Sequence, residues 1–151
     1  MSDYLKLAEE CNADFVIRTT TGITTIYDIS FEQDPYARID CIISSGFTSY
    51  ACELKKRKWS HLKTWNNQPG FVFEEIKFLA LNAHKAPNKL YIILFLDATV
   101  VFNIGEMDLK FHDESLSSTH ERSKKKKKSV TYLTLDRASH IILNKGLATT
   151  M

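Results

Sequence analysis

Apolar residues in the first part of the chain recur first at helical and then at strand-like spacing. Ser2 can cap a helix whose apolar stripe recurs every three or four residues: Tyr4, Leu7, Ala8 and Cys11. β-Branched and apolar runs at residues 15–18 and 23–29 then predict one hairpin. Similar runs at residues 37–43 and 47–55, around a Ser-Ser-Gly turn, predict a second. This part of the chain is therefore expected to form a helix followed by a run of antiparallel strands.

A broadly apolar helix and the longest apolar run lie in the middle of the chain. A polar loop at residues 59–70 leads to a short strand at 71–73 and a helix over 74–83, whose many apolar residues predict burial against a sheet. Residues 90–96 are continuously apolar, which is typical of a central strand covered on both faces. Residues 99–104 predict the neighbouring strand.

The pattern changes again after residue 104. Residues 105–129 show no periodicity and are rich in Ser and Lys, which predicts a long flexible loop. Residues 130–135 predict a last strand, and Asp136 can cap a short helix through residue 143. The expected fold is α/β, with a central mixed sheet flanked by helices.

The composition is typical of one globular domain over residues 1–151. Hydrophobic residues make up 44% of the chain and charged residues 25%. The first ten residues already carry four charges, and the longest apolar run is far shorter than the roughly 18 residues that span a bilayer. We therefore expect a cytoplasmic protein without a membrane partner. The three cysteines have no metal-ligand spacing, which favours reduced core residues over a disulfide framework or a zinc site.

Two acidic residues and a lysine are predicted to meet on one face of the second hairpin. Successive side chains of a strand alternate between faces, so Glu53 and Lys55 point the same way. On the preceding strand the same alternation places Asp40 on the face opposite its apolar neighbours. The core-facing residues of the two strands would be Ile39, Cys41 and Ile43 on the first, and Cys52 and Leu54 on the second.

Such a group has the chemistry of a site for a hard divalent cation. Asp40, Glu53 and the backbone carbonyl of Leu54 would give Mg²⁺ the oxygen ligands that it prefers, with Mn²⁺ as a substitute. Lys55 could orient a water molecule or neutralise charge on a phosphate during phosphodiester hydrolysis. The alternative is an ordinary cross-strand salt bridge on a solvated sheet face.

The segment ARIDCIISSGFTSYACELKKRKW resembles the signature of the PD-(D/E)XK nuclease superfamily, in which a strand Asp precedes a (D/E)xK strand. The order of the predicted elements over residues 2–104 also resembles the restriction-endonuclease-like αβββαβ core. FVFEEIKFLAL followed by LYIILFLDATVVFNI is similar to small members of the superfamily encoded by phages and mobile elements. The resemblance implies a Mg²⁺-dependent endonuclease with Asp40 and Glu53 as metal ligands and Lys55 as the catalytic lysine.

The chain departs from this signature at one position and leaves another open. Ile39 stands where the motif name has Pro. Many members of the superfamily add an acid from the first helix, which would be Glu9 or Glu10 here, and Glu10 is the preferred candidate. A plain surface role remains the alternative for either residue.

Basic residues that could grip a nucleic acid follow the motif directly. Net charge is only +2, so a preference for a polyanion has to come from local clusters. The candidates for phosphate contact are Lys56, Arg57, Lys58, Lys63 and Lys77. Trp59 and Trp65 could stack on bases or cover the edge of the core. The run at residues 124–128 is equally consistent with DNA contact and with a solvated tract.

These features support three hypotheses. The first is a metal-dependent endonuclease that hydrolyses DNA phosphodiester bonds. Specificity for a DNA structure and a homodimeric state are compatible with it, and RNA is left open as a substrate. The second is a catalytically inactive nuclease-fold module that binds nucleic acid or a partner. The third is an unrelated α/β protein in which the three residues form a salt bridge. The sequence contains no Gly-rich phosphate loop, no GxSxG elbow and no His metal-binding motif, so it does not support a nucleotide hydrolase or a serine hydrolase.

Overall fold

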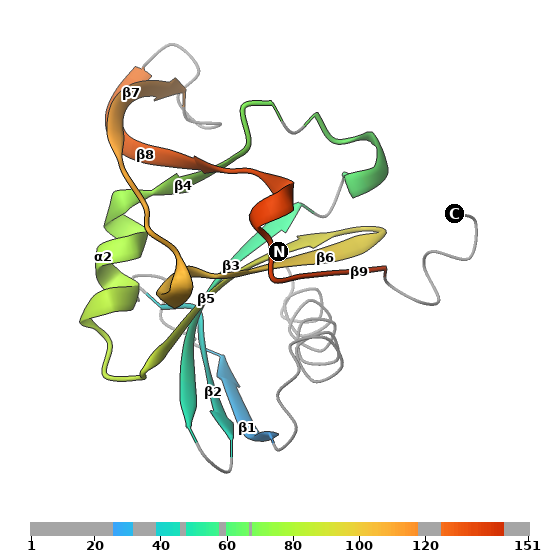
Figure 1. The fold of residues 1–151 in the computed structure, drawn as a ribbon, viewed down its shortest axis with the longest axis vertical. Helices are drawn as coiled ribbons and strands as arrows, with labels where there is room; N and C mark the ends of the chain where they lie inside the picture. The colour runs from blue at the N-terminus through green and yellow to red at the C-terminus, as the bar shows by residue number, and fades with distance from the viewer. Residues whose placement is uncertain are drawn as a thin grey trace, which may run out of the picture.

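Two β-sheets and one α-helix make up the part of the chain that the computed structural model describes (Figure 1). The described residues are 26–31, 39–45, 48–57, 60–66, 68–117 and 125–143. The predicted helix at residues 2–11 and the predicted strand at 15–18 lie outside them. The combination of a mixed sheet and a helix confirms the predicted α/β class.

The larger sheet has six strands in the order β1-β2-β3-β5-β6-β9. Only the central β3–β5 pair is parallel, and every other neighbouring pair is antiparallel, so the sheet is mixed as predicted. The second predicted hairpin is confirmed as β2–β3, and β1 pairs with β2. The bounds of the strands are β1 Ile26–Phe31, β2 Cys41–Ser45, β3 Ser49–Arg57, β5 Asn88–Phe95, β6 Ala98–Asn103 and β9 His140–Leu143.

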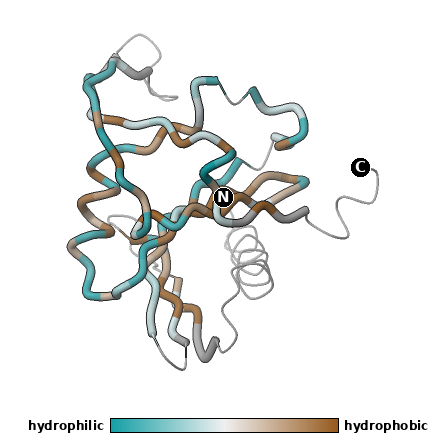
Figure 2. Tube along the Cα trace, in the orientation of Figure 1, coloured by the Kyte–Doolittle hydropathy of each residue, from teal (hydrophilic) through white to brown (hydrophobic). Residues whose placement is uncertain are grey.

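Strand β5 lies at the middle of the core because it is apolar on both faces. All its residues from Lys89 to Phe95 are buried, which confirms the expectation from the continuous apolar run. Tyr91, Ile93 and Phe95 join one hydrophobic cluster, and the alternate residues join another on the opposite face. Figure 2 shows the same concentration of hydrophobic residues along the central strands.

The second cluster includes two buried thiols. Cys41 and Cys52 face each other across β2 and β3 and are free, as expected for reduced core cysteines. A hydrogen bond with Cys41 and then burial raise the pKa of Cys52, which keeps its thiol protonated. Both side chains therefore pack as small hydrophobic groups. The third cysteine, Cys11, lies outside the described ranges.

The first cluster is covered by a second layer, built from a three-stranded sheet and the helix. The sheet has the order β4-β8-β7, with bounds β4 Phe71–Glu74, β8 Lys125–Leu133 and β7 His112–Ser117. Helix α2, Glu75–Ala83, follows β4 directly and confirms the helix predicted at residues 74–83. Phe71, Phe73, Leu81 and Leu133 bring this layer into the first cluster. Three 3-10 turns complete the description: η1 Leu62–Thr64, η2 Ile104–Glu106 and η3 Leu135–Arg137.

Helix α2 is less buried than its composition suggests. Leu81 is its buried residue, whereas Ile76 and Leu79 are 55% and 57% exposed. The prediction of burial against the sheet therefore holds for one side of the helix only: Leu81 and Phe78 join the first cluster, whereas Ile76 and Leu79 face outward. Within the described residues no helix has the length and apolar character needed to cross a membrane.

The flexible loop predicted at residues 105–129 is wrong over much of its length. Strand β7 lies within it, and β8 begins at Lys125, so residues 125–128 of the lysine run are in a strand. The two strands pair in antiparallel register, with Ser115 opposite Lys127. Neither strand has a strong sequence pattern of its own, and the ladders of β8 with β7 and with β4 supply the hydrogen bonds that form this sheet.

The helix predicted after Asp136 is also wrong. Residues 135–137 form η3, and residues 140–143 form β9 at the edge of the larger sheet. The backbone N–H and the hydroxyl of Ser139 both donate to the carbonyl of Val101, at 2.8 and 3.0 Å. These bonds fix the chain beside β6 and direct it into a strand rather than a helix.

We expect Gly70→Ala to lower the free energy of unfolding, whereas Gly105→Ala should leave it nearly unchanged. Gly70 has a φ of 140°, and a Cβ there would lie 2.9 Å from the carbonyl oxygen of Leu133. At Gly105 the nearest atom, Oδ1 of Asn103, would be 3.6 Å away, an ordinary contact. A loss of about 1–3 kcal/mol in urea unfolding is expected for Gly70→Ala alone. Equal stability of the two variants would contradict the close packing of Gly70 on β8.

Candidate functional site

A polar pocket lies between β3 of the larger sheet and the β4–α2 segment of the second layer. Its volume is about 240 Å³. The residues that line it are Asp40, Glu53, Leu54, Lys55, Val72, Phe73, Glu74, Lys77 and Tyr91. It therefore brings together the three residues singled out from the hairpin, together with Leu54 and Lys77.

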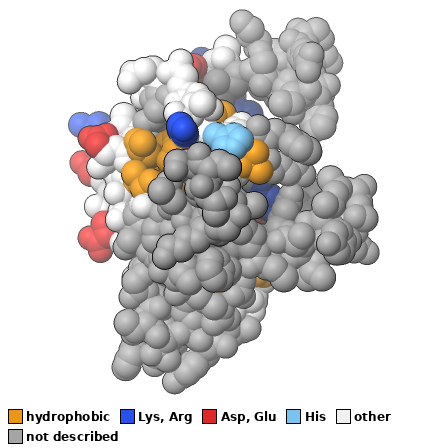
Figure 3. Space-filling model, turned by 90° about the vertical axis from the view of Figure 1, so that its right-hand side faces the viewer, with side chains coloured by type: hydrophobic (Ala, Val, Ile, Leu, Met, Phe, Trp, Pro, Cys, Tyr) orange, Lys and Arg blue, Asp and Glu red, His pale blue; other side chains and the backbone are white. Residues whose placement is uncertain are grey.

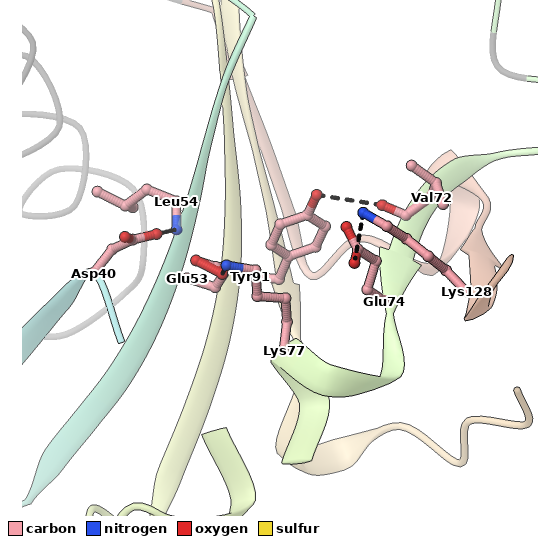
Figure 4. A network of polar contacts seen from close by, with 8 residues as sticks. All are labelled: Asp40, Glu53, Leu54, Val72, Glu74, Lys77, Tyr91 and Lys128. Carbon is pink, nitrogen blue, oxygen red and sulfur yellow. Dashed lines mark hydrogen bonds and ion pairs between the residues drawn. The ribbon is translucent and has the colours of Figure 1, made fainter. Parts of the chain in front are cut away.

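Asp40 is fixed at the start of this pocket by hydrogen bonds to the neighbouring strand. Its backbone N–H donates to the carbonyl of Cys52 at 3.0 Å. Its Oδ2 accepts the N–H of Leu54 at 2.8 Å, so that the carboxylate replaces a backbone partner just before β2 begins (Figure 4). The Leu54 side chain packs against the second cluster, so its backbone is the part that borders the pocket. Because the N–H and C=O of a strand residue point to the same side, the carbonyl of Leu54 also faces the Asp40 side.

The alternation predicted for β3 is confirmed, but the face that carries Glu53 is not solvated. Glu53 lies opposite Tyr91 of β5 and is only 6% exposed. One expectation on the neighbouring strand is wrong: Ile39 packs against the first cluster, whereas Cys41 and Ile43 belong to the second. The alternation stops there because β2 begins only at Cys41.

Glu53 is a buried acidic residue, and one of its side-chain oxygens lacks a hydrogen-bond partner among the described residues. Burial, followed by the hydrogen bond and the charge of Asp40, raises its pKa to about 8, and the Lys77 ammonium acts in the opposite direction. Lys77 Nζ lies 3.3 Å from Oε2 of Glu53. The approach does not satisfy hydrogen-bond geometry, and Oε2 is a buried oxygen without a hydrogen-bond partner in the described part of the chain. Such an orphaned oxygen beside a second carboxylate is expected to attract a positive ion.

The two lysines of the pocket differ in their positions. Lys77 forms the ion pair with Glu53, although the sequence assigned that neighbourhood to Lys55. The Lys55 side chain is exposed, yet partial burial against the pocket, followed by the charge of Arg57, lowers its pKa. The alternative of a surface salt bridge among Asp40, Glu53 and Lys55 is therefore wrong in its main premise, because Glu53 is buried.

Sequence reasoning did not find Glu74 and Tyr91 as members of this network, and it considered Lys128 only as part of the lysine run. Glu74 pairs with Lys128 at 3.3 Å, and the Tyr91 hydroxyl donates to the carbonyl of Val72 at 3.4 Å (Figure 4). Burial raises the pKa of Tyr91, which keeps its hydroxyl protonated. The pairing of β4 with β8 brings Glu74 and Lys128 together, and no local signal predicted that pairing.

The residues present fit a hard cation that keeps water ligands. Two carboxylates and one backbone carbonyl supply oxygen only, which suits Mg²⁺ better than a soft metal. No group of three or more His, Cys, Asp or Glu side chains within the described ranges is placed to hold a metal ion. The donor set is therefore too small for an all-protein cage, and it matches the partial shell that Mg²⁺ often accepts. The candidate third acid, Glu10, lies outside the described residues.

The basic residues after the motif do not all face the pocket. Arg57 shares the face of Glu53 and Lys55 by strand alternation, whereas Lys56 lies on the other face. Lys63 is exposed in η1. Lys58 lies outside the described residues, as does Trp59. Figure 3, which views the molecule from the right-hand side of Figure 1, shows basic and His side chains next to hydrophobic ones on that face.

Trp65 covers the edge of the core, as one of the two interpretations proposed. Its ring contacts Phe71 and Phe95 at centroid distances of 6.4 and 5.5 Å. The guanidinium of Arg57 lies 4.8 Å from the centroid of the same ring. Cation–π contact of this kind holds Arg57 against the core. Base stacking on Trp65 is not favoured by this position.

A buried carboxylate anchors the loop that carries Lys63. Asp97, at the turn between β5 and β6, accepts the N–H groups of Leu62 and Lys63 at 2.6 and 3.1 Å. Ser60 accepts the N–H of Leu96 at 2.9 Å. Burial alone would raise the pKa of Asp97, but the backbone N–H groups of Leu62, Lys63 and Asp97 itself, together with the charge of His61, hold the pKa below the usual value. The loop is thus tied to the end of the central strand.

Comparisons of the chain with protein-family models, curated proteins and solved structures give no match. The function that we propose below therefore depends on the geometry of the pocket and on the residues that line it.

We expect Asp97→Asn to destabilise the protein by about 1–3 kcal/mol at pH 7, because an amide replaces a carboxylate that accepts two buried N–H bonds. The folded-state pKa of Asp97 is depressed, so its contribution is present above the usual pKa of an Asp and is lost as the pH falls through the folded value. The difference between wild type and variant in urea unfolding should therefore shrink below about pH 4. Asp136→Asn, at an exposed site, is the control. A difference independent of pH would contradict the ionised state of Asp97.

Proposed function

We propose that this protein is a Mg²⁺-dependent nuclease that hydrolyses phosphodiester bonds of DNA. The observation that carries the proposal is the convergence of Asp40, Glu53 and Lys55 at one pocket, with the orphaned oxygen of Glu53 inside it. Two carboxylates and an ammonium at one site are what metal-assisted attack on a phosphate requires. The cytoplasmic location expected from the sequence belongs to the same proposal.

Each residue has a role in this chemistry. Asp40, Glu53 and the Leu54 carbonyl would hold the metal. When bound, the ion supplies an activated water and positive charge for the phosphate. The Asp40–Leu54 hydrogen bond fixes the first ligand, and the strand pairing with Tyr91 fixes the second. Lys55 lies where its ammonium can orient the water or neutralise charge on the phosphate.

The arrangement of strands supports a restriction-endonuclease-like core of the PD-(D/E)XK type. β1, β2 and β3 form an antiparallel meander, and β5 returns parallel to β3 after α2. This matches the βββαβ part of the core that the sequence resembles. The chain adds β4 immediately before α2, which gives the pocket its second wall.

DNA is the proposed substrate because basic side chains lie beside the acidic centre. Lys55 and Arg57 share the pocket face of β3, and Lys77 and Lys128 stand on the opposite wall. Such groups attract phosphates without regard to base sequence. A homodimer would suit cleavage of both strands of a duplex. RNA is tested as a competing substrate in the experiment below.

One observation favours the alternative of an inactive binding module. Lys77 already gives Glu53 a positive partner at 3.3 Å, and such a pair could persist in a protein that binds no metal. The experiment separates the two proposals through metal binding and cleavage measured on the same samples.

We expect Mg²⁺- and Mn²⁺-dependent cleavage of DNA that is abolished by EDTA. Asp40→Asn, Glu53→Gln and Lys55→Met should each lower the cleavage rate by at least about 100-fold, because each removes a metal ligand or a charge beside the phosphate. Supercoiled, linear and branched DNA, together with RNA, serve as substrates.

The control variants are Glu106→Gln and Lys85→Met, whose parent residues are exposed and do not line the pocket. Both should cleave at the wild-type rate. Nucleic-acid binding without cleavage, and without Mn²⁺ binding by calorimetry, would favour the inactive module. Absence of metal binding, nucleic-acid binding and cleavage would leave the unrelated α/β protein as the remaining hypothesis.

A further inference from the structure

The ion-pair partner of Glu53 is Lys77, whose side chain is free to move away from the pocket. Helix α2 follows β4 without a linker, so Lys77, in its first turn, stands on the wall opposite β3. The Lys77 side chain is 45% exposed, whereas that of Glu53 is 8% exposed. Glu53 is held by the pairing of β3 with β5, but Lys77 reaches it through a flexible chain of methylene groups.

The ion pair with Lys77 does not satisfy the hydrogen-bonding capacity of the Glu53 side chain. The Lys77 ammonium stands at 3.3 Å without hydrogen-bond geometry, and Oε2 remains unsatisfied. An exposed lysine also loses rotamer freedom when it is held in one position. A small divalent ion could approach Oε2 directly and would not have this conformational cost.

Other cations near the pocket are less suited to this exchange. Lys128 is engaged with Glu74 at 3.3 Å. Lys55 lines the pocket from the same strand as Glu53, and the charge of Arg57 adjoins it. Lys77 is therefore the ammonium group whose displacement would open Glu53 to a metal ion.

We propose that the Lys77 ammonium is an exchangeable counter-ion of Glu53: a divalent cation takes its place, and the released ammonium turns toward a phosphate of the bound nucleic acid. This inference rests on the proposed function. Asp40 and Glu53 contribute two negative charges, which the incoming ion balances, so that Lys55 and Lys77 are left to face the phosphate. Cation binding and phosphate binding are then coupled through one side chain, and each strengthens the other.

The test measures Mn²⁺ binding by calorimetry for wild type, Lys77→Met and Lys85→Met. Because Lys77→Met removes the competing ammonium, it should lower the Kd for Mn²⁺ by roughly three- to tenfold. Lys85 is an exposed lysine that does not line the pocket, so Lys85→Met should keep the wild-type Kd. Lys77→Arg retains a competing cation and should not show the tighter binding.

A second readout uses a short DNA duplex and needs no cleavage. Its Kd is measured in EDTA and in Ca²⁺, which binds oxygen ligands as Mg²⁺ does. In wild type Ca²⁺ should tighten DNA binding more than it does in Lys77→Met, because only the wild type releases an ammonium toward the phosphate. Thermal unfolding of each variant checks that it is folded.

The outcomes separate this inference from the function on which it rests. If wild type binds Mn²⁺ and Lys77→Met binds it equally or more weakly, the exchange is wrong and the metal site stands. If neither protein binds Mn²⁺, both are wrong. Magnesium titration of wild type carrying ¹⁵N-labelled lysine does not depend on the folding of a variant: the Lys77 ammonium signal should shift with Mg²⁺, and a signal that does not move would contradict the exchange.

Discussion

The parallel pairing of β3 with β5 is the constraint on which the pocket depends. Parallel neighbours cannot be joined by a tight turn, so the chain has to cross from one end of the sheet to the other. Here the crossing segment contains η1, β4 and α2, and it covers the face of β3 on which Glu53 stands. A glutamate that would lie in water on a free hairpin is thereby buried. The same crossing brings Glu74 and Lys77 to the opposite wall, which is why a polar pocket forms inside a hydrophobic interface.

Burial of Glu53 determines the electrostatics of that pocket. A carboxylate removed from water needs a positive partner or a proton, and the nearby Asp40 carboxylate makes the negative charge harder to hold. The raised pKa of Glu53, its unsatisfied oxygen and its contact with Lys77 are three consequences of the same position. Glu74, which is less buried, is matched by Lys128 of β8. One ion pair thus links β3 of the larger sheet to α2, and the other links β4 to β8 within the smaller sheet.

Local patterns in the sequence were sufficient to predict the helices and strands whose structure depends only on neighbouring segments of the chain. The β2–β3 hairpin, α2 and β5 follow from alternation, helical spacing and a continuous apolar run, and the hairpin was enough to place Asp40 near Glu53. The predictions are wrong where the structure of a segment depends on its pairing with another segment that is distant in the sequence. The lysines of β8 become part of a strand because β7 pairs with them, while β4 pairs with residues 130–133 of the same strand, and residues 140–143 become β9 because the edge of β6 is available. The burial of Glu53 was missed for the same reason, since the covering segment is not part of the hairpin.

The position of the lysine run changes its relation to the pocket. Residues 125–128 belong to the strand that carries Lys128 to Glu74, so the run continues outward from the pocket wall. Lys127 and Lys128 are consecutive residues of this strand, so their side chains lie on opposite faces of the sheet. Lys127 lies 3.6 Å from Asp113 across the ribbon, and both side chains are largely exposed, so a phosphate could replace the aspartate at little cost. If the protein binds a polyanion as proposed, Lys127 and Lys128 would approach it from a strand rather than from a loop.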